Sequence, residues 1–223
     1  MILDTIARRE VAAGAVHFPG LIDLDEQKLV LAQCIALGNG PAGFYRPTVR
    51  GGGQMHVEMM CLGLHWNAKT YRYESTRSDH DRRSVQPLPD NLKRLAARIG
   101  AAAGMPLEPD LCIVNYYRDG GRMGLHQDKD EESETLRLGV PVVSVSIGDT
   151  ARFLFGGLRR RDAVARIPLA SGDAFVFGGP SRLRYHGVSG IEAGSAPSEL
   201  GLAGRYNLTF RQYCLRPSDG TAC

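Results

Sequence analysis

The chain has 223 residues, of which 43% are hydrophobic and 23% charged, so it can bury a core and is not a disordered polyelectrolyte. It contains no run of eighteen apolar residues that would predict a transmembrane helix, and the segment from Met1 to Glu10 lacks the apolar stretch of a signal peptide. We therefore expect a cytoplasmic, monomeric protein without a membrane partner.

Arginine dominates the basic residues: the 27 lysines and arginines include 23 arginines, and with 24 acidic residues the net charge is +3. The planar guanidinium binds phosphates and carboxylates, which would suit a nucleic-acid partner. A coding bias toward arginine is the simpler explanation of the composition taken alone. The five cysteines are odd in number and include no Cys-x-x-Cys pair, so they imply neither a disulfide framework nor a zinc–thiolate site.

The first predicted helix begins after Asp23, which is typical of an N-cap with Glu26 as its capping-box partner. Its apolar residues recur at helical spacing and lie along one stripe. The stripe consists of Leu24, Val30, Leu31, Cys34 and Ile35. Gly38-Asn39-Gly40 ends this helix.

An irregular stretch follows, with three consecutive glycines at 51–53 and alternating apolar residues over 55–73 that favour hairpins. The polar segment 75–87 is typical of a loop. A second helix opens at Pro89-Asp90-Asn91 and stops by Gly104. Its buried face is predicted to carry Leu92, Leu95, Ala96 and Ile99.

From residue 110 onward the sequence predicts short strands bounded by Gly, Pro, Asp or Ser. They span 111–117, 141–147, 151–155, 164–169, 173–177 and 205–213. Short strands at this spacing favour an antiparallel sandwich or jelly roll over βαβ units. The predicted fold is therefore mainly β with helices, and the two N-terminal helices cover one face of a sheet.

His126-Gln127-Asp128 places an imidazole and a carboxylate two residues apart, so that on a strand both side chains point the same way. His186 is the obvious third ligand, and two histidines with one carboxylate suit non-haem Fe(II). Taken alone this pair is a weak signal, because surface His and Asp often occur two residues apart.

The C-terminal strand supplies a second signal, because Arg205, Asn207, Thr209 and Arg211 share one face by the period of two. Arginines that point into a small β fold are costly unless an anion neutralises them. A dicarboxylate co-substrate would do so, since a guanidinium grips a carboxylate with two hydrogen bonds. For the strand alone, a solvated sheet face is an equally good explanation.

Taken together, these segments resemble the AlkB family of Fe(II)- and 2-oxoglutarate-dependent dioxygenases, which remove alkyl groups from nucleic-acid bases. The resemblance is strong over 105–215 and weaker back to Met55. The motifs that carry it are Asn115-Tyr116-Tyr117, the run from Leu125 to Glu131, Ser144-Val145-Ser146, Phe155-Gly156-Gly157-Leu158, Ser181-Arg182-Leu183, Tyr185-His186-Gly187 and the run from Arg205 to Arg211.

The resemblance implies roles for individual residues. The implied iron ligands are His126, Asp128 and His186. The implied 2-oxoglutarate residues are Asn115, Tyr116, Tyr117, Arg205, Asn207, Thr209 and Arg211, with Arg211 on the distal carboxylate and Arg205 near the iron-bound end. The implied base and nucleic-acid residues are Trp66, Tyr71, Tyr73, Asp130, Glu131 and Arg160. Trp66 and His126 would sandwich a flipped base, whereas without the resemblance the single tryptophan would be interpreted as a core residue.

The resemblance further implies a double-stranded β-helix core over 105–215, preceded by an extension over 1–104 that carries a nucleotide-recognition lid at about 45–88, all within a single domain of 1–223. The implied reaction uses Fe(II), 2-oxoglutarate and O2 to dealkylate 1-methyladenine and 3-methylcytosine, releasing formaldehyde, succinate and CO2. The expected partner is alkylated single-stranded DNA, with double-stranded DNA and RNA as further candidates.

Two other functions stay open at this point. An oxygenase of the same fold could act on protein or small molecules, although Trp66, Asp130 and Arg160 argue against it. A non-catalytic nucleic-acid-binding module could retain the fold, although the intact triad and both arginines argue against a loss of activity.

Overall fold

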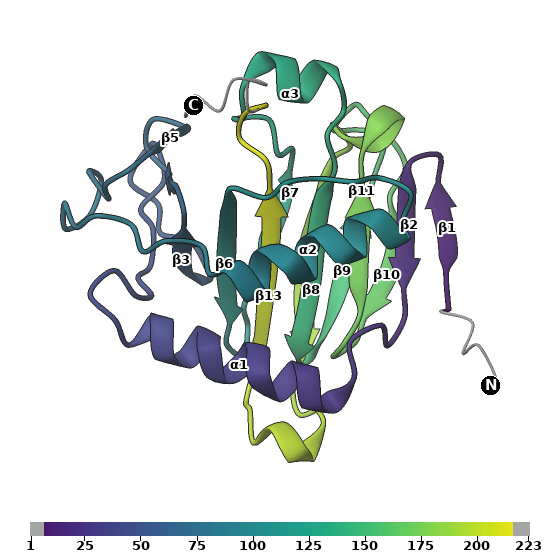
Figure 1. The fold of residues 1–223 in the computed structure, drawn as a ribbon, viewed down its shortest axis with the longest axis horizontal. Helices are drawn as coiled ribbons and strands as arrows, with labels where there is room; N and C mark the ends of the chain where they lie inside the picture. Colours follow the sequence, from purple (N-terminus) through teal and green to yellow (C-terminus); the bar gives the residue numbers. More distant parts are fainter. Residues whose placement is uncertain (1–6, 216–223) are drawn as a thin grey trace.

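Two antiparallel β-sheets form the centre of the computed structural model, which describes residues 7–215 (Figure 1). The larger sheet has seven strands in the order β1-β2-β11-β8-β13-β6-β3, and the smaller has four in the order β10-β9-β12-β7. A separate two-stranded hairpin, β4-β5, lies beside the larger sheet at the left of Figure 1. The predicted jelly-roll class is confirmed.

The strands of the larger sheet are β1 (Arg9–Ala12), β2 (Ala15–Phe18), β3 (Glu58–Leu62), β6 (Leu111–Tyr117), β8 (Val142–Gly148), β11 (Ala174–Phe177) and β13 (Arg205–Arg211). The smaller sheet consists of β7 (Met123–His126), β9 (Thr150–Phe155), β10 (Ala165–Leu169) and β12 (His186–Glu192), and the hairpin of β4 (His65–Asn67) and β5 (Arg72–Glu74). All six predicted strands occur. The period-two signal missed β1, β2, β7 and β12, because they are short or interrupted by glycine and polar residues.

Both predicted helices lie across the outer face of the larger sheet (Figure 1). In α1 (Leu24–Gly38) the Asp23 carboxylate accepts a hydrogen bond from the Glu26 backbone N–H at 2.9 Å, as predicted for the N-cap, whereas the Glu26 carboxylate pairs with Arg98 instead of completing a capping box. The predicted stripe is wrong at one position: Ile35 is 45% exposed. Gln27 is buried in α1 instead, and its amide donates to the Ile22 carbonyl.

The second long helix, α2 (Asp90–Ala102), buries the four residues that its pattern predicted. Together with α1 it covers an apolar core against the larger sheet. A third helix, α3 (Ser133–Arg137), and two short 3-10 turns, Gly179–Ser181 and Ser198–Leu200, complete the elements of the described residues. Among residues 7–215, no helix combines the length and the apolar character that crossing a membrane requires.

Strand β13 separates two environments, because successive side chains alternate between its faces. Tyr206, Leu208 and Phe210 join the core beneath the helices. Arg205 and its period-two partners face the space between the sheets, where they line a cavity. The fold thus directs polar side chains into the interior of the jelly roll, which is otherwise packed with phenylalanine and other apolar residues.

Among residues 7–215, no cysteine belongs to a group of side chains that could bind a metal ion. Cys34, Cys61 and Cys112 are buried free thiols, and burial raises the pKa of Cys34 and Cys61 to about 12. Cys214 is disulfide-bonded, which the cysteine count did not predict. The N-terminal residues 1–6 and Cys223, which entered the sequence analysis, lie outside the described residues.

Candidate active site

Cross-strand pairing brings two histidines of the smaller sheet together. His126, the last residue of β7, is the register partner of His186, the first residue of β12, and their ring centroids are 4.4 Å apart. Asp128 lies two residues beyond β7 in an extended segment rather than within a strand, as the sequence analysis had it. One potential ligand atom from each of the three residues lies within 4.8 Å of the others.

The backbone fixes which ring nitrogens face the triad. His126 Nδ1 lies 2.9 Å from the Gly124 carbonyl, and His186 Nδ1 lies 3.0 Å from the Arg184 carbonyl. A carbonyl only accepts, so both Nδ1 atoms carry the proton and both Nε2 atoms keep a free lone pair. Burial, assisted by the neighbouring His186, lowers the pKa of His126 to about 4, so its ring is neutral at pH 7 and able to ligate.

The two carboxylate oxygens of Asp128 differ in their contacts. Oδ1 accepts from Arg211 Nη2 at 2.6 Å, whereas the buried Oδ2 has no hydrogen-bond partner among the described residues. Burial raises the pKa of Asp128, but Arg211 and the two histidines outweigh it and hold the pKa well below its usual value. An ionised oxygen without a hydrogen-bond partner, beside two imidazoles whose Nε2 atoms face it, is the donor set that a divalent ion such as Fe(II) requires.

The triad opens into a cavity of about 510 Å³ between the sheets. The polar residues on its β13 side are Arg205, Asn207, Thr209 and Arg211, and β6 adds Asn115 and Tyr117. Ser144 of β8 also lines it, and its hydroxyl accepts from the Asn207 amide at 2.8 Å. Ser144 belongs to the motif Ser144-Val145-Ser146, for which no role was predicted.

The two arginines of β13 occupy opposite ends of this cavity. They are six residues apart on one strand, so their Cα atoms are separated by about 20 Å. Arg211 contacts the triad through Asp128, and Asp128 helps to raise the pKa of Arg211 against the effect of burial. The implied placement of Arg211 on the distal carboxylate, with Arg205 near the iron-bound end, is therefore wrong, and the two arginines exchange places.

Arg205 is an uncompensated buried cation. It is 1% exposed, donates from Nη2 to Ser146 Oγ at 2.9 Å, and lies with its guanidinium carbon 5.2 Å from the centroid of the Tyr117 ring. No carboxylate of residues 7–215 pairs with it, and its Nε and Nη1 have no hydrogen-bond partner there. Burial lowers the pKa of this guanidinium, and an anion in the cavity would restore the missing interactions.

Tyr116 does not belong to this cavity. Strand alternation turns it to the opposite face of β6, where it stacks on Tyr206 at 4.6 Å between ring centroids and its hydroxyl donates to the Ala203 carbonyl. The expectation that Tyr116 binds 2-oxoglutarate is therefore wrong. The motif placed three adjacent residues in one role, although a strand presents only alternate residues to one face.

A hydroxyl deletion tests this placement. Because the Tyr116 hydroxyl lies outside the cavity, Tyr116→Phe should leave the apparent affinity for 2-oxoglutarate unchanged. Tyr117→Phe removes a hydroxyl inside the cavity and should weaken that affinity. Titration of succinate formation against 2-oxoglutarate measures both, and a rise in KM for Tyr116→Phe alone would contradict the placement.

The residues implied in base binding divide into two groups. Trp66, Tyr71, Asp130 and Arg160 line the cavity. Tyr71 and Arg160 are exposed at its mouth. The other two, Tyr73 and Glu131, are not among the lining residues, and their assignment to the base or the DNA backbone stays a prediction.

Tyr73 and Glu131 instead form a polar network behind Arg211. The Tyr73 hydroxyl accepts from Arg211 Nη1 at 2.5 Å and lies 3.2 Å from Glu131 Oε1. Glu131 pairs with the buried Arg182 at 2.8 Å, and Arg182 also donates to the carbonyls of Val140 and Asp128. Arg182 was not predicted to have a role, and its place in the motif Ser181-Arg182-Leu183 was its only signal in the sequence.

Known proteins match this chain over most of its length. A sequence model of the 2OG-Fe(II) oxygenase superfamily matches residues 14–211. The DNA N(6)-methyladenine demethylase ALKBH1C of Arabidopsis thaliana is 38% identical over 224 residues, which cover 91% of this chain and 49% of that protein. The alpha-ketoglutarate-dependent dioxygenase AlkB homolog of Caulobacter vibrioides is 40% identical over 205 residues, which cover 91% of this chain and 89% of that protein.

A solved structure agrees with these matches: the structure of OsALKBH1 has a TM-score of 0.86 at 37% identity and covers 92% of this chain and 100% of that chain. The chain spans about half the length of the Arabidopsis relatives that it matches. The superfamily is defined by Fe(II) and 2-oxoglutarate, which the open His-Asp-His triad and the uncompensated arginine fit. The chain belongs to the 2OG-Fe(II) oxygenase superfamily and, within it, to the AlkB family, as its motifs predicted.

Proposed function

We propose that this chain is a DNA dealkylase that oxidises N-alkyl groups on bases with Fe(II), 2-oxoglutarate and O2. The observation that carries the proposal is a single cavity that holds the triad, the uncompensated Arg205 and the indole of Trp66. A metal, a dicarboxylate and an aromatic base therefore have separate places within one enclosure. The names of the relatives, a DNA N(6)-methyladenine demethylase and an AlkB dioxygenase, support the same class of reaction.

In this proposal the residues of β13 bind the co-substrate along the cavity. Arg205 grips the distal carboxylate with the donors that lack a partner, and Arg211 lies beside the keto acid end through its contact with Asp128. When bound, Fe(II) and 2-oxoglutarate supply with O2 the oxidising power that hydroxylates the N-alkyl carbon. His126, Asp128 and His186 hold the metal, and the enclosing sheets keep bulk water from the reacting carbon.

The base would enter the cavity from the side of the hairpin. A base within a duplex cannot reach a metal between two sheets, so it is flipped out or presented in a single strand. Trp66 supplies an aromatic face, and its indole N–H donates to Asp130 Oδ2 at 2.8 Å. Burial raises the pKa of Asp130, although the Trp66 hydrogen bond opposes this effect. Trp66 stacking then places the base opposite His126.

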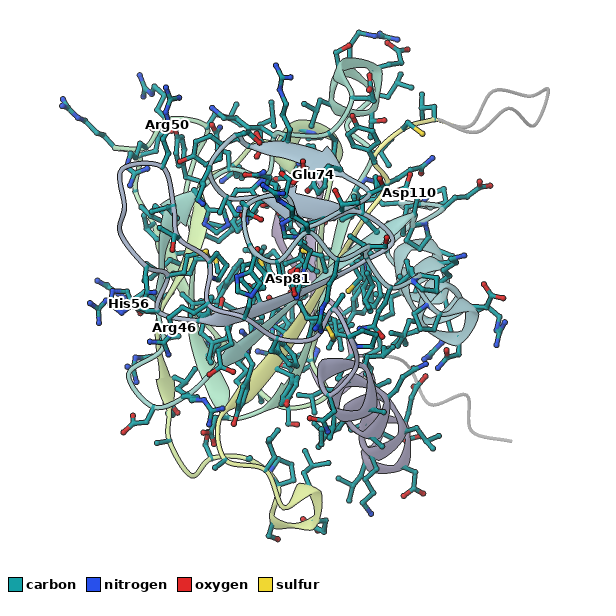
Figure 2. All side chains as sticks on the ribbon, turned by 90° about the vertical axis from the view of Figure 1, so that its left-hand side faces the viewer. Arg46, Arg50, His56, Glu74, Asp81 and Asp110 are labelled. Atoms are coloured by element: carbon teal, nitrogen blue, oxygen red, sulfur yellow. The ribbon has the colours of Figure 1, made fainter. Side chains whose placement is uncertain are left out.

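Basic side chains near the cavity mouth would bind the phosphates on either side of the flipped base. Arg46 and Arg50 flank Val49, which lines the cavity, and neither forms an ion pair within residues 7–215. Figure 2, viewed from the hairpin side, places Arg46 and Arg50 along the same border of this face. Exposed arginines without a carboxylate partner attract phosphate through charge, independently of sequence.

We expect the enzyme to prefer lesions that carry positive charge. Methylation at N1 of adenine or N3 of cytosine removes pairing and makes the ring cationic, which lowers the flipping cost and favours stacking on Trp66. A cation–π gain of about 0.5–2 kcal/mol corresponds to roughly 2- to 30-fold in rate over neutral 3-methylthymine. Single-stranded oligonucleotides with one 1-methyladenine, 3-methylcytosine, 3-methylthymine or N6-methyladenine, read by mass spectrometry, measure this preference.

Two controls make the lesion experiment specific. Asp130→Asn keeps an oxygen that can accept from the Trp66 N–H but removes the carboxylate charge, so it should reduce the preference without loss of stacking. Equal rates on 3-methylcytosine and 3-methylthymine would contradict the charge argument. A higher rate on N6-methyladenine than on both cationic lesions would assign the chain to the activity in the name of its Arabidopsis relatives. Succinate formation stimulated by peptides and not by methylated DNA would favour the protein oxygenase instead.

A further inference from the structure

The hairpin β4-β5 is joined to the metal loop, residues 128–131, by two side-chain hydrogen bonds. Trp66 and Tyr73 are directly opposite each other in the hairpin, so both side chains project from one face. Trp66 Nε1 donates to Asp130 Oδ2 at 2.8 Å, and the Tyr73 hydroxyl donates to Glu131 Oε1 at 3.2 Å. One cross-strand pair is thus anchored to two consecutive residues of the metal loop.

Tyr73 also connects the hairpin to the metal carboxylate. Its hydroxyl accepts from Arg211 Nη1 at 2.5 Å, and Arg211 Nη2 contacts Asp128 Oδ1 at 2.6 Å. Burial raises the pKa of Tyr73 well above its usual value, so the phenol keeps its proton and can donate to Glu131. A continuous path of hydrogen bonds therefore runs from the hairpin to the triad.

The loop end of this connection is held by buried ion-pair and backbone contacts, whereas the hairpin end is short. Arg182 is 2% exposed and holds Glu131 at 2.8 Å while also donating to the backbone carbonyl of Asp128. The hairpin has only three residues in each strand, and a two-stranded hairpin of that size has little stability of its own. Apolar packing of Trp66 and Tyr73 holds the hairpin against β3 and β6, and the two hydrogen bonds are what join it to the metal loop.

Resting on the proposed function, we propose that Tyr73 is a positioning residue and that the Trp66–Asp130 and Tyr73–Glu131 hydrogen bonds form a latch that fixes the indole relative to the triad. The latch sets the distance between a base stacked on Trp66 and the metal. When it is loosened, 2-oxoglutarate and O2 still give succinate and CO2 but the alkyl carbon is misplaced, so the second oxygen atom is reduced to water by an added reductant such as ascorbate and no formaldehyde forms. Tyr73 acts through Arg211 and Glu131 and touches neither the base nor the metal.

The first test uses the metal-free protein and needs no activity. Trp66 is the only tryptophan of the chain, so its fluorescence reports on the latch directly. Tyr73→Phe removes one hydroxyl, and we expect acrylamide to quench Trp66 about twofold more strongly because the hairpin opens locally. The matched control is Tyr213→Phe, which removes a hydroxyl from a ring whose centroid lies 5.3 Å from that of Tyr73, and it should match the wild type.

A second variant tests the same latch in case Tyr73→Phe does not fold. If circular dichroism shows that Tyr73→Phe is unfolded, Asp130→Ala opens the other arm of the latch and should increase quenching in the same way. Glu131→Gln retains an oxygen that accepts from the Tyr73 hydroxyl, and it should leave quenching closer to the wild type than Tyr73→Phe does. Wild-type quenching in both Tyr73→Phe and Asp130→Ala would overturn the latch.

The second test measures coupling in the enzyme loaded with Fe(II) and 2-oxoglutarate. With an oligonucleotide that contains 3-methylcytosine, formaldehyde per succinate should fall about tenfold in Tyr73→Phe, since small misplacements of a reacting carbon are costly. Tyr213→Phe should keep the wild-type ratio. An unchanged ratio in a Tyr73→Phe variant with increased quenching would overturn the positioning role. A wild type without lesion-dependent succinate, but with the quenching difference intact, would overturn the proposed function and not the latch.

Discussion

Replacing Asp128 with Ala should abolish both metal binding and succinate formation. The variant removes the buried carboxylate that lies beside both imidazoles, and it leaves Arg211 with Glu131, at 3.5 Å, as its remaining carboxylate partner. Breaking a buried ion pair by removing one partner costs about 3–5 kcal/mol, so the variant should also melt at a lower temperature than the wild type. Titration of the apo-protein with Fe(II) without oxygen, together with calorimetry, measures both effects.

His126→Ala separates loss of the ligand from loss of stability. Removal of the His126 side chain leaves no buried arginine unpaired, so the variant should fold normally and still lose the metal. The exposed His80, which stacks on Tyr45, serves as the control, and His80→Ala should bind Fe(II) like the wild type. Wild-type affinity in both Asp128→Ala and His126→Ala would show that the metal is held elsewhere.

Arg205→Lys should raise the KM for 2-oxoglutarate by more than tenfold, which corresponds to a loss of about 1.4 kcal/mol. The lysine keeps the charge but loses the planar pair of donors that a carboxylate accepts. The affinity of the Arg205→Lys variant for Fe(II) should not change, because Arg205 has no contact with the triad among the described residues. Initial rates of succinate formation over a range of 2-oxoglutarate concentrations provide the measurement.

The matching variant of Arg211 shows which of the two arginines lies beside the metal. Arg211→Lys disturbs Asp128 directly and should weaken Fe(II) binding together with co-substrate binding. Arg98→Lys, on the surface of α2 and paired with Glu26, is the neutral control. If Arg205→Lys left KM unchanged while Arg211→Lys raised it at constant metal affinity, the assignment of the two arginines would have to be reversed again.

For β13, the sequence could predict which residues share a face of the strand, but not which end of the strand lies near the metal. Alternation along one strand was enough to place Arg205 and Arg211 on one face, because it depends only on the backbone, and the neighbouring candidate iron site favoured an interior face over a solvated one. Which arginine lies near the metal depends on the long-range register that pairs Arg205 with Gly148 of β8 and with Tyr117 of β6. No local pattern encodes that register.

The hairpin residues were harder to predict for a related reason. A motif transfers a tyrosine such as Tyr73 by its position, but the partner of its hydroxyl is set by a segment 58 residues away in the chain. The same holds for Trp66, whose indole N–H meets Asp130 at a separation of 64 residues. The α1 cap, by contrast, is a contact over three residues, and the sequence predicted it correctly.

If Arg205 binds 2-oxoglutarate as proposed, its burial makes the co-substrate a folding ligand as well as a reactant. A cation that gains its missing partners only on binding destabilises the free protein, so the folded population should follow the concentration of dicarboxylates. A ligand at one hundred times its dissociation constant adds about 2.7 kcal/mol to the free energy of unfolding, which is enough to alter turnover by cellular proteases. Succinate carries the same distal carboxylate, so the product would protect the protein from degradation while delaying its next catalytic cycle.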